Sequence, residues 1–136
     1  MPIARRRFAT MCGLLLLPLA ACNTGGPAYE LPAGFYGAVV DMTSTLNFDP
    51  ASVTIRAGET VLWRNRSLFA HTVTFDPDKA ADPAHVLLPD GAEPFASGDI
   101  PAGEVYARKF TVPGTYRYTC LTHEDLGMHG TIVVNP

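Results

Sequence analysis

The chain has few basic residues, and nothing in its pattern indicates long helices or internal repeats. Its 136 residues include 10 Lys and Arg against 13 Asp and Glu, which gives a formal net charge of −3. Three of the basic residues are the consecutive arginines at 5–7, so beyond the leader described below 7 basic residues remain against 13 acidic ones. An acidic domain without a basic cluster argues against nucleic acid as a partner.

The longest apolar stretch, at 11–21, is too short to span a bilayer, which takes about 20 residues. It follows the arginine run and leads into small residues, and this layout predicts an export signal over residues 1–21. A buried core helix is the alternative, which the clustered arginines disfavour. The end of the segment, "LAAC" at 19–22, resembles a bacterial lipobox. That resemblance implies lipidation of Cys22, whereas ordinary Ala-x-Ala cleavage is the competing reading.

The start of the leader, "RRRF" at 5–8, also resembles a twin-arginine export signal, although paired arginines are common in basic leaders. Residues 22–34 are rich in Gly, Pro and Ala and predict a flexible tether. The predicted folded domain covers residues 35–136. We therefore expect an exported protein, anchored through lipid in the periplasm or on the outer cell surface.

Cysteine is too scarce for a disulfide framework. There are 3 cysteines, and Cys12 lies in the leader while Cys22 is the expected lipid site. Only Cys120 remains as a free thiol, and exported proteins usually pair their cysteines. An unpaired thiol of this kind is either buried and inert or held by a ligand.

From residue 35 onward the pattern is one of short apolar runs separated by turn residues. We predict strands at 37–43, 52–57, 59–65, 71–75, 104–112, 115–120 and 130–135. Seven or eight short strands in about 100 residues indicate an all-β sandwich or small barrel. Residues 76–100, rich in Pro, Asp and Ala, predict a long excursion with one short helical turn.

Possible metal ligands are concentrated in "YTCLTHEDLGMHG" at 118–130, which holds Cys120, His123 and Met128. A further histidine, His71, begins the predicted strand at 71–75, and a sandwich can bring it beside this loop. Thiolate and thioether sulfur with two imidazoles suits copper, whereas structural zinc normally uses more cysteines. A nucleophilic Cys–His pair is possible but leaves Met128 unexplained.

The stretches "HTVTFD" at 71–76 and "PGTYRYTCLTHEDLGMHG" at 113–130 resemble the plastocyanin/pseudoazurin branch of the cupredoxins. The resemblance covers roughly residues 38–135 and implies a Greek-key β-sandwich with one copper ion. It implies that His71, Cys120 and His123 are equatorial ligands and that Met128 is the axial one. His85 and His129 are expected to make no metal contact, with His129 on the surface.

The chain departs from the family pattern at Thr72, where the family often has Asn, and at Leu121-Thr122, where a small residue and Pro are common. Family members use these positions for hydrogen bonds that stiffen the ligand loop, so we expect a weaker bond from Thr72. Glu124 and Asp125 are expected to form a solvated, negative loop tip that favours a basic partner.

The resemblance implies a one-electron carrier whose electrons pass through the exposed edge of His123. The apolar residues expected to surround that edge are Leu68, Phe69, Leu121 and Leu126. Brief docking of redox proteins to a monomer fits a patch of this size. Copper storage or delivery with the same ligands remains open, as does a partner-binding sandwich with incidental copper. A dinuclear centre would need a second cysteine near Cys120.

Overall fold

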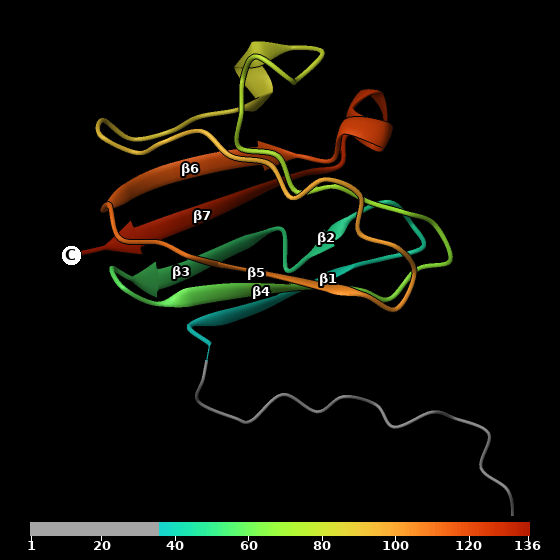
Figure 1. Ribbon diagram of the computed structural model, residues 1–136, viewed down its shortest axis with the longest axis horizontal. Coiled ribbons are helices and arrows are strands. Elements are labelled where there is room, and N and C mark those ends of the chain that lie inside the picture. The colour runs from blue at the N-terminus through green and yellow to red at the C-terminus, as the bar shows by residue number, and fades with distance from the viewer. Residues whose placement is uncertain (1–35) are drawn as a thin grey trace, which may run out of the picture. The chain divides into compact units, whose positions relative to one another are not determined.

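A computed structural model describes residues 36–136. The predicted leader and tether, including the proposed lipid site at Cys22, lie outside the described residues. Seven strands and two short 3-10 helices make up the described part (Figure 1). Among these residues, neither helix combines the length and apolar character that a bilayer crossing requires.

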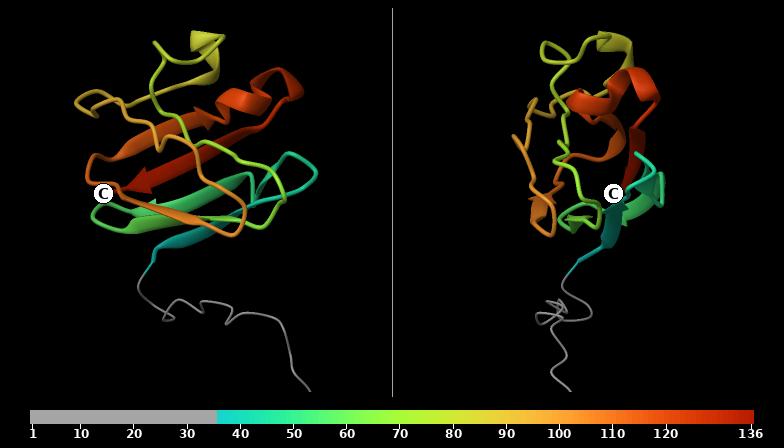
Figure 2. Two further views of the ribbon diagram at one scale, coloured as in Figure 1. Left: turned by 45° about the vertical axis from the view of Figure 1, so that its right-hand side comes forward. Right: turned by 90° about the vertical axis from the view of Figure 1, so that its right-hand side faces the viewer.

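The strands form two sheets that pack face to face as a sandwich (Figures 1 and 2). One sheet has the order β2 (Phe48–Asp49), β1 (Ala38–Met42), β4 (Thr60–Asn65), β5 (Val105–Lys109). The other has the order β3 (Ser52–Arg56), β7 (His129–Asn135), β6 (Gly114–Thr119). The β1–β4 and β3–β7 pairs are parallel and the remaining pairs are antiparallel. The predicted all-β sandwich is confirmed.

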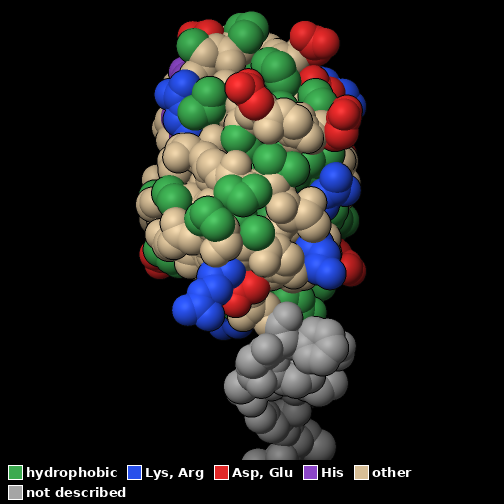
Figure 3. Space-filling model, turned by 90° about the vertical axis from the view of Figure 1, so that its left-hand side faces the viewer, with side chains coloured by type: hydrophobic (Ala, Val, Ile, Leu, Met, Phe, Trp, Pro, Cys, Tyr) green, Lys and Arg blue, Asp and Glu red, His purple; other side chains and the backbone are tan. Residues whose placement is uncertain are grey.

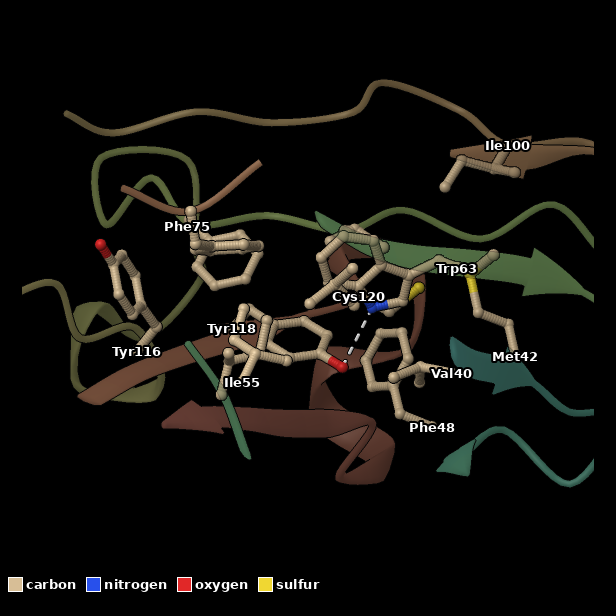
Figure 4. Packing of buried hydrophobic residues seen from close by; sticks show 14 of the residues in the cluster. Val40, Met42, Phe48, Ile55, Trp63, Phe75, Ile100, Tyr116, Tyr118 and Cys120 are labelled. Carbon is tan, nitrogen blue, oxygen red and sulfur yellow. Dashed lines mark hydrogen bonds between the residues drawn. The ribbon is translucent and has the colours of Figure 1, made fainter. Parts of the chain in front are cut away.

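Alternating apolar side chains of the strands fill the space between the sheets. Tyr116, Tyr118 and Cys120 were predicted to share one face, and all three are buried. In the centre of the core, Trp63 Nε1 donates a hydrogen bond to Tyr118 Oη at 3.1 Å (Figure 4). This bond matters because an unpaired polar group in a dry core would be costly. The core therefore fixes the end of β6, from which Cys120 follows directly.

The prediction of a strand at 71–75 is wrong. The segment makes only isolated bridges, from His71 to Ile100 and from Thr74 to both Ala96 and Thr119. The main-chain hydrogen bonds of this segment go to two different neighbouring parts of the chain. The Val73 N–H donates to the Ser97 hydroxyl instead of to a carbonyl group of a paired strand. Covered from both sides, all five residues are buried, including the two threonines that strand alternation would place on the other face.

The excursion at 76–100 is confirmed, and its helical turn is η1 (Pro83–His85). The Asp82 side chain caps this turn by accepting a hydrogen bond from the Ala84 N–H at 2.9 Å. Leu87 then bridges to Arg117, which lays the excursion along β6. At the left-hand end of the molecule in Figure 1, charged side chains of both signs are scattered and Lys and Arg gather in no single field (Figure 3).

Candidate metal centre

Three side chains with metal-binding atoms meet at one end of the sandwich. Cys120 Sγ lies 3.7 Å from His71 Nδ1 and 3.5 Å from His123 Nδ1. The three donor atoms all lie within 4.8 Å of one another. His71 and Cys120 are fully buried, whereas His123 is half-buried. The sequence prediction that His71 joins the Cys120 loop agrees with this geometry.

The ligand loop owes its shape to main-chain hydrogen bonds. Residues Leu121–Leu126 form η2, which is broken by a non-helical φ of −133° at His123 and ends at Gly127 with a φ of +81°. Such a positive φ favours glycine because it has no side chain. The Cys120 N–H donates to the Met128 carbonyl at 3.0 Å, and the Met128 N–H donates to the His123 carbonyl at 3.3 Å. These bonds fold the loop back so that its two ends lie side by side.

A polar network fixes the orientation of the His71 ring. His71 Nε2 lies 2.8 Å from Ser67 Oγ, which in turn is 2.7 Å from Asn65 Oδ1. Because Asn65 Oδ1 only accepts, the Ser67 hydroxyl donates to it and accepts from the ring N–H. The lone pair of Nδ1 is then directed at the Cys120 side. Burial, and to a lesser degree the neighbouring His123, lowers the pKa of His71, which favours the neutral form that metals bind.

Thr72 makes the hydrogen bond to the ligand loop that the sequence analysis expected to be weaker. Its hydroxyl accepts a hydrogen bond from the Leu121 N–H at 2.8 Å, and its own N–H donates to Cys120 Sγ at 3.3 Å. Threonine is shorter than asparagine, but the two segments lie close enough for its hydroxyl to reach. The distance of 2.8 Å is an ordinary one for an N–H to oxygen hydrogen bond, so the expectation of a weaker bond from Thr72 is wrong.

Glu124 is not part of a solvated loop tip, and that prediction is also wrong. Its side chain is buried and accepts N–H hydrogen bonds from Ala81 at 2.9 Å and Asp82 at 3.0 Å. His85 Nδ1 lies 2.8 Å from the same carboxylate. Burial alone would raise the pKa of Glu124, but the hydrogen bonds from Asp82, His85 and Ala81 outweigh it and lower the pKa. Of the two acidic residues, only Asp125 is exposed.

The two remaining histidines form a pair beside this carboxylate. The rings of His85 and His129 have centroids 4.2 Å apart, and His129 Nδ1 lies 3.0 Å from Thr119 Oγ1. His129 was expected on the surface and is half-buried by this packing. Within residues 36–136, neither histidine belongs to a group of three metal-binding side chains. Sequence reasoning missed the contact to Glu124 because no local pattern links positions 85 and 124.

Met128 is buried, whereas most of the residues predicted to form an apolar patch are exposed. Met128 is fully buried, beside Cys120 through the main-chain bond already described. Three of the four predicted patch residues are strongly exposed, with exposed fractions of 87% for Leu68, 51% for Phe69 and 68% for Leu126. Leu121 is half-buried.

The chemistry of the donors fits copper. A buried thiol, the only free cysteine among the described residues, faces two imidazole nitrogens. Soft sulfur with two imidazoles suits copper, and the thioether of the buried Met128 would complete the set found in blue-copper sites. A β-sandwich that carries these donors at one end defines the cupredoxin class of copper proteins.

Comparisons with known proteins agree with this class. The family model of copper binding proteins, plastocyanin/azurin family, matches residues 37–135. The chain is 43% identical over 94 residues to a plastocyanin of Scenedesmus fuscus, covering 68% of this chain and 90% of that protein. It is 39% identical over 94 residues to a chloroplastic plastocyanin of Tetradesmus obliquus, covering 68% of this chain and 61% of that protein. The chain therefore belongs to the plastocyanin/azurin family of copper-binding proteins, whose cofactor is one copper ion.

Solved structures support the same fold. Amicyanin from Paracoccus versutus superposes with a TM-score of 0.57 at 30% identity, covering 79% of this chain and 88% of that chain. A copper-containing nitrite reductase from Thermus scotoductus SA-01 superposes with a TM-score of 0.55 at 28% identity. That match covers 73% of this chain but only 22% of the enzyme.

The role of Glu124 in bracing the loop can be tested by substitution. Glu124→Ala leaves the Ala81 and Asp82 N–H groups and His85 without their acceptor, so it should lower the free energy of unfolding by about 2 kcal/mol. Asp125→Ala, at the exposed neighbouring position, should change it by less than about 0.5 kcal/mol. Urea denaturation of the metal-free variants measures both. Equal effects of the two substitutions would show that the buried carboxylate does not brace the loop.

Proposed function

We propose that this protein is a one-electron carrier whose copper ion is held by His71, Cys120 and His123, with Met128 as a weak fourth ligand. The observation that carries the proposal is the assembly of three donor atoms within 4.8 Å, around a thiol that is fully buried. When bound, copper supplies a one-electron couple between Cu(I) and Cu(II). We propose no catalytic residue, because the described donors suit a closed site that passes electrons.

The side chains around the donors support electron transfer by resisting movement. The Asn65–Ser67 network holds the His71 ring, and the two Thr72 hydrogen bonds hold the Cys120 loop. A site that keeps its shape in both oxidation states needs little reorganisation for each electron. Cys120 and His71 are buried, so the half-buried His123 offers the route by which electrons reach a partner.

We further propose that redox partners dock on the apolar patch formed by Leu68, Phe69, Leu121 and Leu126. Leu68 and Phe69 lie between Ser67 and His71 in the sequence, while Leu121 and Leu126 lie on either side of His123. Electron-transfer contacts are weak and brief, which fits a small apolar surface on a monomer. The contact surface of such a partner should be apolar as well.

The colour of the copper-loaded protein tests the ligand proposal. Covalency between Cu(II) and the Cys120 thiolate should produce an intense visible charge-transfer band. Cys120→Ser should abolish the band while the fold, measured by far-ultraviolet circular dichroism, persists. A wild-type protein that binds copper tightly but stays colourless would contradict electron transfer and favour copper storage or delivery.

The docking patch is tested by electron self-exchange, which requires no knowledge of the partner. Two copper-loaded copies meeting through their patches should exchange electrons about tenfold more slowly in Leu68→Gln. The loss corresponds to about 1.4 kcal/mol, the order expected when part of a leucine no longer becomes buried. Leu87→Gln changes another exposed leucine, on the excursion, and should leave the rate unchanged. Equal rates for the Leu68 variant and the wild type would show that docking does not use the patch.

We also propose that the protein is exported and held at a membrane through lipid on Cys22. The sequence at 1–22 supports this proposal, with its arginine run, short apolar stretch and lipobox-like ending. Such an anchor would keep the carrier at the cell envelope while the segment at 22–34 separates it from the membrane. Stable anchoring requires more than one acyl chain.

The anchor can be tested in cells that express the full chain. Cys22→Ser should release the protein from the membrane fraction into the soluble fraction. Mass spectrometry of the wild-type protein should find acyl groups at Cys22. A Ser variant that stays with the membrane, together with an unmodified Cys22 in the wild type, would contradict the lipid anchor without affecting the copper proposal.

A further inference from the structure

Thr122 places a hydroxyl group directly beside the proposed ligands. Its Oγ1 lies 3.3 Å from Cys120 Sγ and 3.1 Å from His123 Nδ1. Within residues 36–136, it is the only side-chain hydroxyl at hydrogen-bonding distance from this sulfur. The residue itself is exposed, so packing does not account for its orientation toward the two donors.

The thiolate is the acceptor of this hydroxyl proton once the ligands are engaged. A threonine hydroxyl has one proton to donate, and two acceptors compete for it here. If His123 binds a metal through Nδ1, as proposed above, the lone pair of that nitrogen is used and cannot accept. Cys120 Sγ then remains as the acceptor within reach, and charge strengthens such a hydrogen bond.

The second hydrogen bond to the sulfur is of a different kind. The Thr72 N–H donates to Cys120 Sγ at 3.3 Å from a segment that is buried on both sides. That donor belongs to the main chain and is the same for any residue other than proline at position 72. The Thr122 hydroxyl belongs to a side chain at the surface, so substitution can remove it without disturbing the core.

We propose that Thr122 is a positioning residue that raises the reduction potential of the copper centre by donating a hydrogen bond to the Cys120 thiolate. The inference rests on the proposed ligand set. A hydrogen bond withdraws electron density from the sulfur, and Cu(II) depends on that density more than Cu(I) does. The bond therefore stabilises the reduced form relative to the oxidised form, consistent with the general control of blue-copper potentials by hydrogen bonding around the sulfur.

Substitution at this exposed position separates the hydroxyl from the shape of the side chain. Thr122→Val keeps a branched side chain of similar size and removes the hydroxyl, whereas Thr122→Ser keeps the hydroxyl. Redox titration should show that Thr122→Val favours the oxidised form about tenfold more than the wild type does. For a one-electron couple this is a decrease of about 59 mV. Thr122→Ser should stay close to the wild type.

A spectroscopic measurement distinguishes this role from a structural one. The unpaired electron of oxidised blue copper is shared with the thiolate sulfur, so pulsed electron–nuclear double resonance detects protons bonded to it. Transfer into deuterated buffer should remove a coupled exchangeable proton from the wild type and Thr122→Ser. Thr122→Val should lack the hydroxyl proton and keep the proton of the Thr72 N–H, while urea denaturation of the metal-free variants should give an unchanged free energy of unfolding.

The outcomes separate this inference from the proposed function. A blue wild-type protein in which Thr122→Val leaves both the potential and the proton coupling unchanged would overturn the inference alone. Equal shifts in the Val and Ser variants would also overturn it, because shape would then be responsible. A wild-type protein without the blue band would instead overturn the ligand set on which the inference rests.

Discussion

The hydrogen bonds of Thr72 are the interactions on which the rest of the metal centre depends. The Thr72 N–H reaches Cys120 Sγ, and its hydroxyl receives the Leu121 N–H. These two bonds join the buried segment at 71–75 to the loop that follows β6, and so fix the spacing of His71 and Cys120. A buried thiol that already receives a main-chain hydrogen bond is held in a defined position, in contrast to a cysteine that only fills space.

The excursion at 76–100 also holds the ligand loop in place. Its turn at 81–85 surrounds the buried Glu124 carboxylate, which follows directly after His123. The ligand loop is thus braced on one side by Thr72 and on the other by the excursion. The charge of Glu124 therefore lies inside the protein, and Asp125 is the exposed acidic residue of the loop tip.

Most of the fold and the donor set could be predicted from sequence, because residue type and period carry that information. The parity of Tyr116, Tyr118 and Cys120 gave one buried face, and the spacing of Cys120, His123 and Met128 indicated a ligand loop. The strand at 71–75 was predicted wrongly because its alternation is real, yet its backbone bonds to two unrelated neighbours. The burial of Glu124 could not be predicted, since its partners lie about forty residues away in a segment without periodicity.

We infer that the chain itself holds the donor atoms in place and that copper only occupies the position between them. Crystal structures of the protein without metal and with copper test this claim most directly. We expect His71, Cys120 and His123 to keep the same side-chain rotamers in both structures, with the Thr72 and Ser67 hydrogen bonds intact and copper bound to Cys120 Sγ and both Nδ1 atoms. A copper-loaded structure in which one of these side chains has swung to a new rotamer, or in which Cys120 does not bind the metal, would contradict it.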